Sequence, residues 1–171
     1  MKMQNALSGI VGAIALLGPA TALAGGSVSA VAQASVLILA PVTIAATQNL
    51  DFGTVTRPGN EASNTITLDS SSTVLVSGGG DGKRSSSPVS AAKFNVVGDT
   101  GVTYSTTQTL SFDQPGLINV TASAPAVSNG APGVIPESGV QELRFGGSFM
   151  LSAATPAQAY SGALSVTVNY N

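Results

Sequence analysis

Short segments in which apolar and polar residues alternate dominate the chain from Gly25 onward. The clearest is ALSVTVNYN, where Leu164, Val166, Val168 and Tyr170 alternate with Ser, Thr and Asn. Successive side chains of a β-strand point to opposite faces of a sheet, so this pattern predicts one core face and one solvated face. Gly, Pro, Asn, Asp or Ser separate the segments, and they show no helical periodicity. We therefore expect an all-β, immunoglobulin-like sandwich.

Ten strands are expected, together with two stretches rich in turn-forming residues. The strands span residues 27–39, 42–46, 51–56, 65–68, 73–77, 91–97, 102–107, 117–122, 140–151 and 163–170. Gly146 and Gly147 interrupt the long strand and indicate a bulge or a close backbone approach. The stretches 77–88 and 124–137 are expected to be exposed, mobile loops.

The low charge of the chain limits its partners. At 171 residues, one domain is the default, and only 8% of the residues are charged, compared with about a quarter in a typical domain. The formal net charge is −2, and the basic residues are scattered apart from Lys83 and Arg84. Nucleic-acid binding needs clustered cations, so nucleic acid is not expected as a partner.

The first 24 residues have the three-part pattern of a secretory signal peptide. Lys2 precedes an uncharged stretch that ends in the small residues Ala22-Leu23-Ala24. Cleavage is expected after Ala24, and Ala32-Gln33-Ala34 offers a second site that fits the same rule. We expect residues 1–24 to be the signal peptide, 25–40 an N-terminal extension and 41–171 the sandwich, with no membrane span in the mature chain.

The N-terminal extension reads as a strand without an obvious partner in its own chain. Its more apolar face consists of Val28, Ala30, Ala32, Ala34, Val36 and Ile38. Such a strand gains several kcal/mol if it finds a groove, from about 1.5 to 3 kcal/mol for each buried Val or Ile and roughly 1 kcal/mol for each hydrogen bond. Left unpaired, it is an aggregation-prone edge. We therefore expect this segment to pair with another molecule.

The sequence offers few of the residue types on which enzymes rely for catalysis. The chain has no His and no Cys, so it lacks the commonest general base, the usual zinc ligands, a thiol nucleophile and disulfides. Lys83 and Lys93 could serve a Ser/Lys dyad, but neither lies in an identifiable catalytic motif. We expect a protein that is not an enzyme, without catalytic residues, metal site or cofactor.

Four stretches together resemble a widespread bacterial family of secreted proteins of unknown function. They are PVTIAATQNLDFGTV, AAKFNVVGDTGVTYS, LRFGGSFML and the closing YSGALSVTVNYN, and the resemblance covers nearly all of residues 41–171. The closing stretch is also similar to the end of fimbrial subunits of the alternative chaperone/usher class. The chain departs from the better-known pilins at Gln158, where they have Gly.

The fimbrial resemblance implies donor-strand complementation, in which the N-terminal strand of one subunit fills a groove in the next. It implies a pilin-like fold, with Val28 to Ile38 as the donor strand and Leu164, Val166, Val168 and Tyr170 in the C-terminal strand that accepts it. The implied partners are copies of the chain or other fibre subunits, a periplasmic chaperone and an outer-membrane usher. The implied location is the cell surface, reached through the periplasm.

A second hypothesis is a monomeric secreted binding module, for example for carbohydrate. In this case the N-terminal strand completes its own sheet. Carbohydrate sites usually present aromatic platforms, but aromatic residues make up only 5% of this chain and it has no Trp. We therefore favour the first hypothesis, a structural or adhesive subunit of a bacterial surface fibre.

Overall fold

The computed structural model describes residues 28–171. The signal peptide expected over residues 1–24, and residues 25–27 of the extension, lie outside the described residues. The chain divides into two units, residues 1–36 and residues 37–171, and each is considered by itself. No helix long and apolar enough to cross a membrane is found in residues 28–171.

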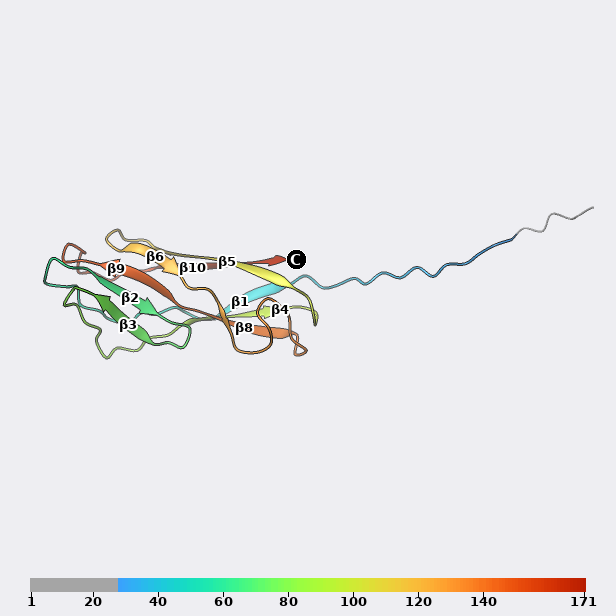
Figure 1. Ribbon diagram of the computed structural model, residues 1–171, viewed down its shortest axis with the longest axis horizontal. Coiled ribbons are helices and arrows are strands. Elements are labelled where there is room, and N and C mark those ends of the chain that lie inside the picture. The colour runs from blue at the N-terminus through green and yellow to red at the C-terminus, as the bar shows by residue number, and fades with distance from the viewer. Residues whose placement is uncertain (1–27) are drawn as a thin grey trace, which may run out of the picture. The chain divides into compact units, whose positions relative to one another are not determined.

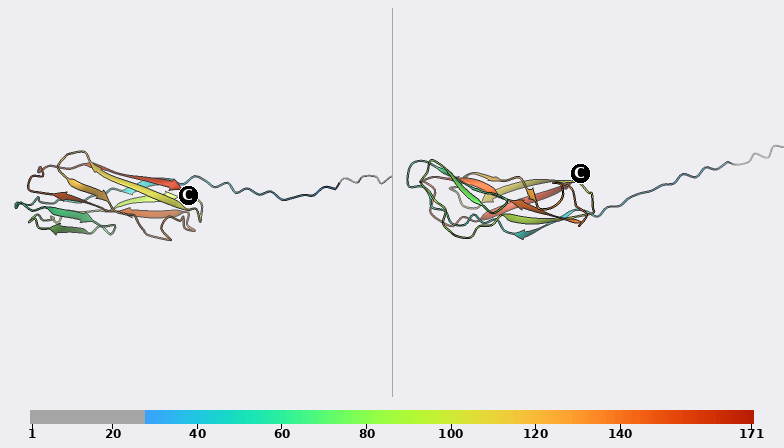
Figure 2. Two further views of the ribbon diagram at one scale, coloured as in Figure 1. Left: turned by 45° about the horizontal axis from the view of Figure 1, so that its top comes forward. Right: turned by 60° about the horizontal axis from the view of Figure 1, so that its bottom comes forward.

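The unit formed by residues 37–171 is all-β, which confirms the expected sandwich (Figure 1). Its strands are β1 (Thr43–Gln48), β2 (Asn64–Leu68), β3 (Val74–Gly78), β4 (Ala92–Val97), β5 (Tyr104–Phe112), β6 (Ile118–Ala122), β7 (Ala126–Val127), β8 (Val140–Phe145), β9 (Gly147–Leu151) and β10 (Gly162–Tyr170). Two sheets have four strands each, in the orders β1-β4-β8-β7 and β3-β2-β9-β6. The long strands β5 and β10 pair with each other as a ribbon (Figure 2). All strand pairs are antiparallel.

Two hydrophobic clusters form the core, and the ribbon of β5 and β10 contributes to both. The first cluster packs Val96, Leu143 and Phe145 of the β1-β4-β8-β7 sheet against Val166 and Val168 of β10. The second brings together the inward side chains of the β3-β2-β9-β6 sheet and of β5, namely Ile66, Leu68, Phe149, Leu151 and Leu110, with Phe52. Leu164 packs against both clusters, so β10 links the two halves of the sandwich.

The expected strand over residues 140–151 is two strands, and Gly146 marks the point where the chain passes from one sheet to the other. β8 pairs with β4, whereas β9 pairs with β2 and β6. A Cβ atom on Gly146 would lie 1.9 Å from the carbonyl oxygen of Leu68. The close backbone approach expected here is confirmed, and it requires glycine.

Two expected strands are not formed. Residues 51–56 make only isolated bridges, Asp51 with Ser90 and Val55 with Arg84. The Asp51 carboxylate accepts the amide of Gly53 at 2.7 Å, and Gly53 has a φ of +69°, so a local turn breaks the strand. The strand expected over residues 27–39 is also not formed at residues 28–39, which have no ladder partner within the described residues.

The two stretches expected to be exposed, mobile loops are tied to the sandwich. Asn64 is 2% exposed, and its side chain accepts the amide of Gly82 at 2.9 Å and donates to the carbonyl of Gly80 at 2.9 Å. In the second stretch, residues 126–127 form β7 and Ile135 is 1% exposed in the core. Residues 77–88 are mostly exposed, as expected, and residues 124–137 are partly exposed, but buried residues anchor each stretch to the sandwich.

Candidate functional site

An apolar groove of about 1130 Å³ opens along the sandwich. Its first wall is residues 48–57, which follow β1, and its second wall is residues 155–164, which lead into β10. The floor comes from strands of both core clusters: Ala92, Phe94, Leu110, Phe112, Leu117, Phe149 and Leu151. The core of the sandwich is therefore accessible between the first and last strands.

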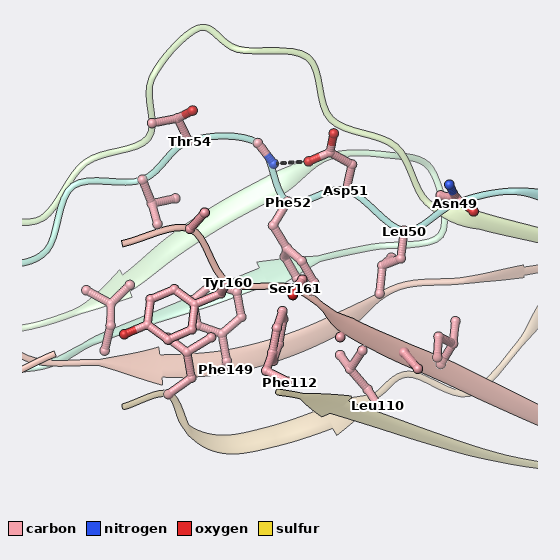
Figure 3. A pocket seen from close by; sticks show the side chains of 18 of the residues that line it. Asn49, Leu50, Asp51, Phe52, Thr54, Leu110, Phe112, Phe149, Tyr160 and Ser161 are labelled. Carbon is pink, nitrogen blue, oxygen red and sulfur yellow. Dashed lines mark hydrogen bonds between the residues drawn. The ribbon is translucent and has the colours of Figure 1, made fainter. Parts of the chain in front are cut away.

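Aromatic side chains gather at one part of the groove (Figure 3). Phe52 of the first wall lies edge-on to Phe149, with ring centroids 5.0 Å apart, and Phe149 lies 5.8 Å from Phe112. Tyr160 of the second wall packs 6.5 Å from Phe112, and its hydroxyl donates to the carbonyl of Pro156 at 2.9 Å. These contacts make a rigid floor, since edge-to-face aromatic packing favours one arrangement of the rings.

Each wall is continuous with a strand that has a free edge: the first wall follows β1, and the second leads into β10. Within the described residues, β1 is paired only with β4, and β10 is paired only with β5. An edge strand presents unpaired N–H and C=O groups that can form a ladder with an added strand. The groove therefore combines an apolar floor with two sets of backbone groups able to bind an extended peptide.

Arg57 joins the two walls at one end of the groove. Its Nη1 donates to the carbonyl of Thr155 at 3.1 Å. Thr155 is 6% exposed and is fixed in turn, because its hydroxyl accepts the amide of Ser152 at 2.9 Å and donates to the carbonyl of Gly116 at 3.2 Å. Arg57 and Asp51 are the charged residues among those that line the groove. The remaining lining is uncharged, as a site for an uncharged strand requires.

The expected acceptor residues lie on β10. Leu164, Val166 and Val168 are half-buried and pack against the core, and Leu164 also lines the groove. Tyr170 is 47% exposed at the end of the strand. Three of the four side chains therefore occupy the inner face of the strand beside the groove.

The expected donor residues lie in the leading segment, which we define as residues 25–40. The even-numbered side chains from Val28 to Ile38 are all exposed. Val28 is 99% exposed, Val36 83% and Ile38 85%. The segment contains no charged residue. Residues 28–39 therefore present exposed apolar side chains, and their backbone N–H and C=O groups form no ladder within the described residues.

Sequence reasoning missed the aromatic floor and the first wall. Leu50 and Phe52 alternate with the polar Asn49 and Asp51, and this pattern was available as a signal of an inward face. It could not show that these residues lie opposite Tyr160, which is more than one hundred positions away in the chain.

Asp69, Asp81 and Tyr104 have shifted pKa values, and none of these residues lines the groove. The hydroxyl of Ser71 and the amide of Thr73 lower the pKa of Asp69 below its usual 3.8. The amides of Gly59 and Asn60 lower that of Asp81. Burial raises the pKa of Tyr104. These shifts report loop anchoring and core packing.

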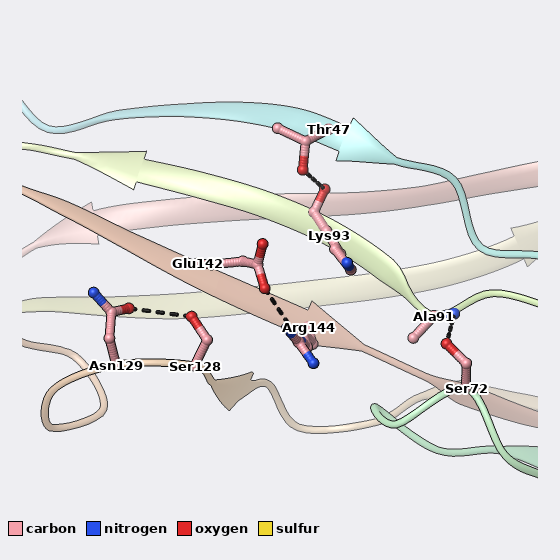
Figure 4. A network of polar contacts seen from close by, with 8 residues as sticks. All are labelled: Thr47, Ser72, Ala91, Lys93, Ser128, Asn129, Glu142 and Arg144. Atoms are coloured by element: carbon pink, nitrogen blue, oxygen red, sulfur yellow. Dashed lines mark hydrogen bonds and ion pairs between the residues drawn. The ribbon is translucent and has the colours of Figure 1, made fainter.

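The polar contacts on the β1-β4-β8-β7 sheet are structural in character (Figure 4). The Arg144 guanidinium lies 2.7 Å from the Glu142 carboxylate, and the Thr47 hydroxyl donates to the carbonyl of Lys93 at 3.2 Å. Neither Lys83 nor Lys93 lines the groove. In the described part of the chain, no three acidic side chains gather closely enough to hold a metal ion.

Comparison with known proteins places this sandwich in a family. No match is found among curated proteins or among solved structures. A family model described as a domain of unknown function, DUF4402, matches residues 42–170, which include every strand and both walls of the groove. The chain belongs to the DUF4402 family.

Proposed function

We propose that the protein is a non-enzymatic subunit of a bacterial surface fibre, assembled by donor-strand exchange. The observation that carries the proposal is the apolar groove between two free strand edges, in a chain that also carries an exposed, uncharged, alternating segment. The groove takes the leading segment of another copy, which adds a strand beside β10.

The length of the leading segment matches the strand it has to follow. β10 has nine residues, which span about 30 Å at roughly 3.3 Å per residue. The alternating part of the leading segment, residues 28–38, is slightly longer than that. Only residues 39–42 separate it from the start of β1. Successive subunits in the fibre are therefore closely spaced.

One register brings small side chains opposite large ones. In an antiparallel arrangement with Val28 opposite Tyr170, the three alanines at 30, 32 and 34 lie opposite Val168, Val166 and Leu164 in that order. Directly opposite residues of antiparallel strands share a face, so all these side chains point to the core. Val36 then lies opposite Gly162, beside the aromatic floor around Phe112.

The groove has to widen toward the end of β10 as the strand enters. Its lining reaches along β10 as far as Leu164, and Cα atoms of β1 and β10 come within 8 Å of each other. A strand inserted between two others needs about 9.5 Å between them, which is twice the usual spacing. We propose that residues 34–38 occupy the preformed part and that the remaining residues separate β1 from β10.

The antiparallel sense leads to a fibre. β10 ends beside the start of β1 (Figure 1), at what we call the exit end, where Ala40 donates to Asp99 at 2.7 Å and Asn171 donates to the carbonyl of Thr103 at 3.2 Å. An antiparallel incoming segment places its own sandwich at the opposite end of the acceptor. The exit end of the acceptor then stays free, and its own leading segment can enter the groove of the next copy. Repetition of this step gives an open head-to-tail assembly.

The proposed route to the surface follows from the expected signal peptide. Residues 1–24 direct export, and a periplasmic chaperone and an outer-membrane usher keep the groove occupied until a second copy arrives. The absence of Cys means that the exported fold depends on packing and on the added strand rather than on disulfides.

The proposal is tested by deleting residues 25–38 from the mature protein. Size-exclusion chromatography and electron microscopy of the intact mature chain should show ladders of oligomers and fibres, and the deletion should give a monomer that keeps its β-sheet circular dichroism spectrum. An unchanged assembly state after the deletion contradicts donor-strand exchange.

Two aspartate substitutions separate the faces of the leading segment. Ala34→Asp places a charge against the apolar floor and should block assembly, since an unpaired buried charge is costly. Ser35→Asp places the same charge on the outward face and should leave assembly intact. Equal effects of the two variants contradict a strand with one buried face.

The monomeric binding module is the other outcome of these experiments. In that case the intact chain is a monomer, its leading segment is protected from proteolysis by its own groove, and deletion of residues 25–38 exposes an apolar surface without changing the oligomeric state.

A further inference from the structure

A carboxylate at one end of the sandwich and a guanidinium at the other each lack an ion pair within residues 28–171, although the guanidinium end also carries Asp81 beside Gly59 and Asp113 beside Ser161. Within the described residues, the exit end carries the acids Asp99 and Glu137 in the turns 98–103 and 133–139, and these turns contain no Lys or Arg. At the other end of the groove, which we call the groove end, the bridge from Arg57 to Thr155 presents a cation. Neither Arg57 nor Asp99 forms an ion pair within residues 28–171.

Asp99 is fixed to the leading segment at the point where that segment leaves the sandwich. Its Oδ2 accepts the amide of Ala40 at 2.7 Å, and Val42, two residues further on, packs against the first core cluster. A carboxylate has about four acceptor positions, so this bond leaves Asp99 able to accept further donors. Wherever Ala40 is placed in an assembly, Asp99 goes with it.

Arg57 is equally fixed to the end of the groove. One of its five N–H donors is used by Thr155, and its side chain is exposed. With Val36 of an incoming segment opposite Gly162, where β10 begins, Ala40 of that segment lies beyond the strand, beside residues 155–161 of the second wall, which form no strand and include Thr155. The register therefore brings Ala40, and the carboxylate bound to it, to the Arg57 end of the groove.

We propose that Arg57 of the acceptor and Asp99 of the incoming copy form an ion pair at each junction between subunits, and that this pair sets the register of the inserted strand. The inference rests on the proposed function, because it needs a second copy in the groove. Slippage of the strand by two residues keeps the same face inward but moves Asp99 by about 7 Å, which breaks the pair. The ion pair thus discriminates between registers that the apolar face alone accepts.

Charge reversal tests the pair in the full-length mature protein. Arg57→Glu and Asp99→Lys each place like charges at the junction, and each should raise the concentration at half-assembly about fivefold, as expected for an exposed pair. The double variant restores opposite charges with the signs exchanged but loses the acceptor for the Ala40 amide, so it should assemble better than either single variant without reaching the parent protein. A double variant no better than the worse single variant overturns the proposal.

Three further measurements separate the pair from other effects of these changes. Asp99→Asn keeps an oxygen for the Ala40 amide but loses the charge, so it should weaken assembly, whereas Lys93→Glu on the β1-β4-β8-β7 sheet should not. Thermal unfolding of Asp99→Asn, which keeps an oxygen for the Ala40 amide, should match that of the parent. Loss of assembly by the Lys93→Glu control to the same extent means that net charge alone is responsible, and overturns the proposal.

The deletion of residues 25–38 distinguishes failure of the ion pair from failure of donor-strand exchange. Assembly that survives the deletion overturns both the fibre and the ion pair. Assembly that requires residues 25–38 but shows no rescue in the Arg57→Glu/Asp99→Lys double variant overturns the ion pair and leaves donor-strand exchange standing.

Discussion

At the scale of single residues, Asp81 anchors the loop between β3 and β4. Its Oδ1 accepts the amides of Gly59 at 2.6 Å and Asn60 at 3.3 Å. These bonds favour the charged carboxylate and lower its pKa below 3.8. Because the pKa is lower in the folded than in the unfolded chain, the stability that Asp81 contributes is present above about pH 3.8 and is lost as the pH falls below that value.

Asp81→Asn should therefore lower the melting temperature at neutral pH, and the difference from the parent protein should shrink as the pH falls below 3.8. Thermal unfolding followed by circular dichroism between pH 2.5 and pH 7 measures this. The neighbouring acid substitution Glu61→Gln serves as the control. A difference between Asp81→Asn and the parent that stays constant over the whole range contradicts the anchoring role.

Gln141 holds the loop after β7 onto the core. It is fully buried, accepts the hydroxyl of Tyr104, and donates to the carbonyls of Asn129 at 2.7 Å and Ala131 at 3.0 Å. Gln141→Ala leaves these partners without hydrogen bonds and should cost roughly 2 to 4 kcal/mol of unfolding free energy. Tyr104→Phe removes one bond and should cost less. Urea denaturation of both variants checks the order, and a larger loss for Tyr104→Phe contradicts it.

At the scale of elements, the passage from β8 to β9 depends on the absence of a side chain at Gly146. Gly146→Ala would place Cβ 1.9 Å from the Leu68 carbonyl oxygen, a backbone atom that cannot move aside without breaking the pairing of β2 with β9. We expect a loss of about 3 kcal/mol or more. In Gly59→Ala the new Cβ lies 3.5 Å from Asp81, an ordinary contact, so this control should be nearly neutral. Urea denaturation measures the unfolding free energy of both variants. Equal losses for Gly146→Ala and Gly59→Ala would contradict the role of the close approach at Gly146.

The elements also show what alternation can predict. The inward side chains of β10, and the glycine at the crossing between β8 and β9, follow from period two and from punctuation in the sequence. The strand expected at residues 51–56 fails because the Asp51 side chain competes for the backbone, which alternation does not report. The groove depends on Phe52 and Tyr160 both packing against Phe112, and no local pattern in the sequence contains these tertiary contacts.

At the scale of the whole molecule, the first and last strands of the sandwich leave an apolar groove between them, and the same chain carries an exposed strand-like segment. We propose that the exposed segment of one copy fills the groove of the next. In the proposed register, Ser35 of the incoming copy lies directly opposite Ala163 on the outward face of β10. The side chains of these two residues are therefore adjacent.

Disulfide cross-linking tests this claim most directly, since the chain has no Cys of its own. Two variants are mixed, Ser35→Cys in one copy and Ala163→Cys in the other, so that any bond between these positions joins two chains. Ser111→Cys, opposite Ala163 on β5 and one strand further from the groove, replaces Ala163→Cys as the control. Mass spectrometry should find the 35–163 disulfide in high yield and the 35–111 disulfide at background. Equal yields for the two, or no 35–163 bond under oxidising conditions, would contradict the account.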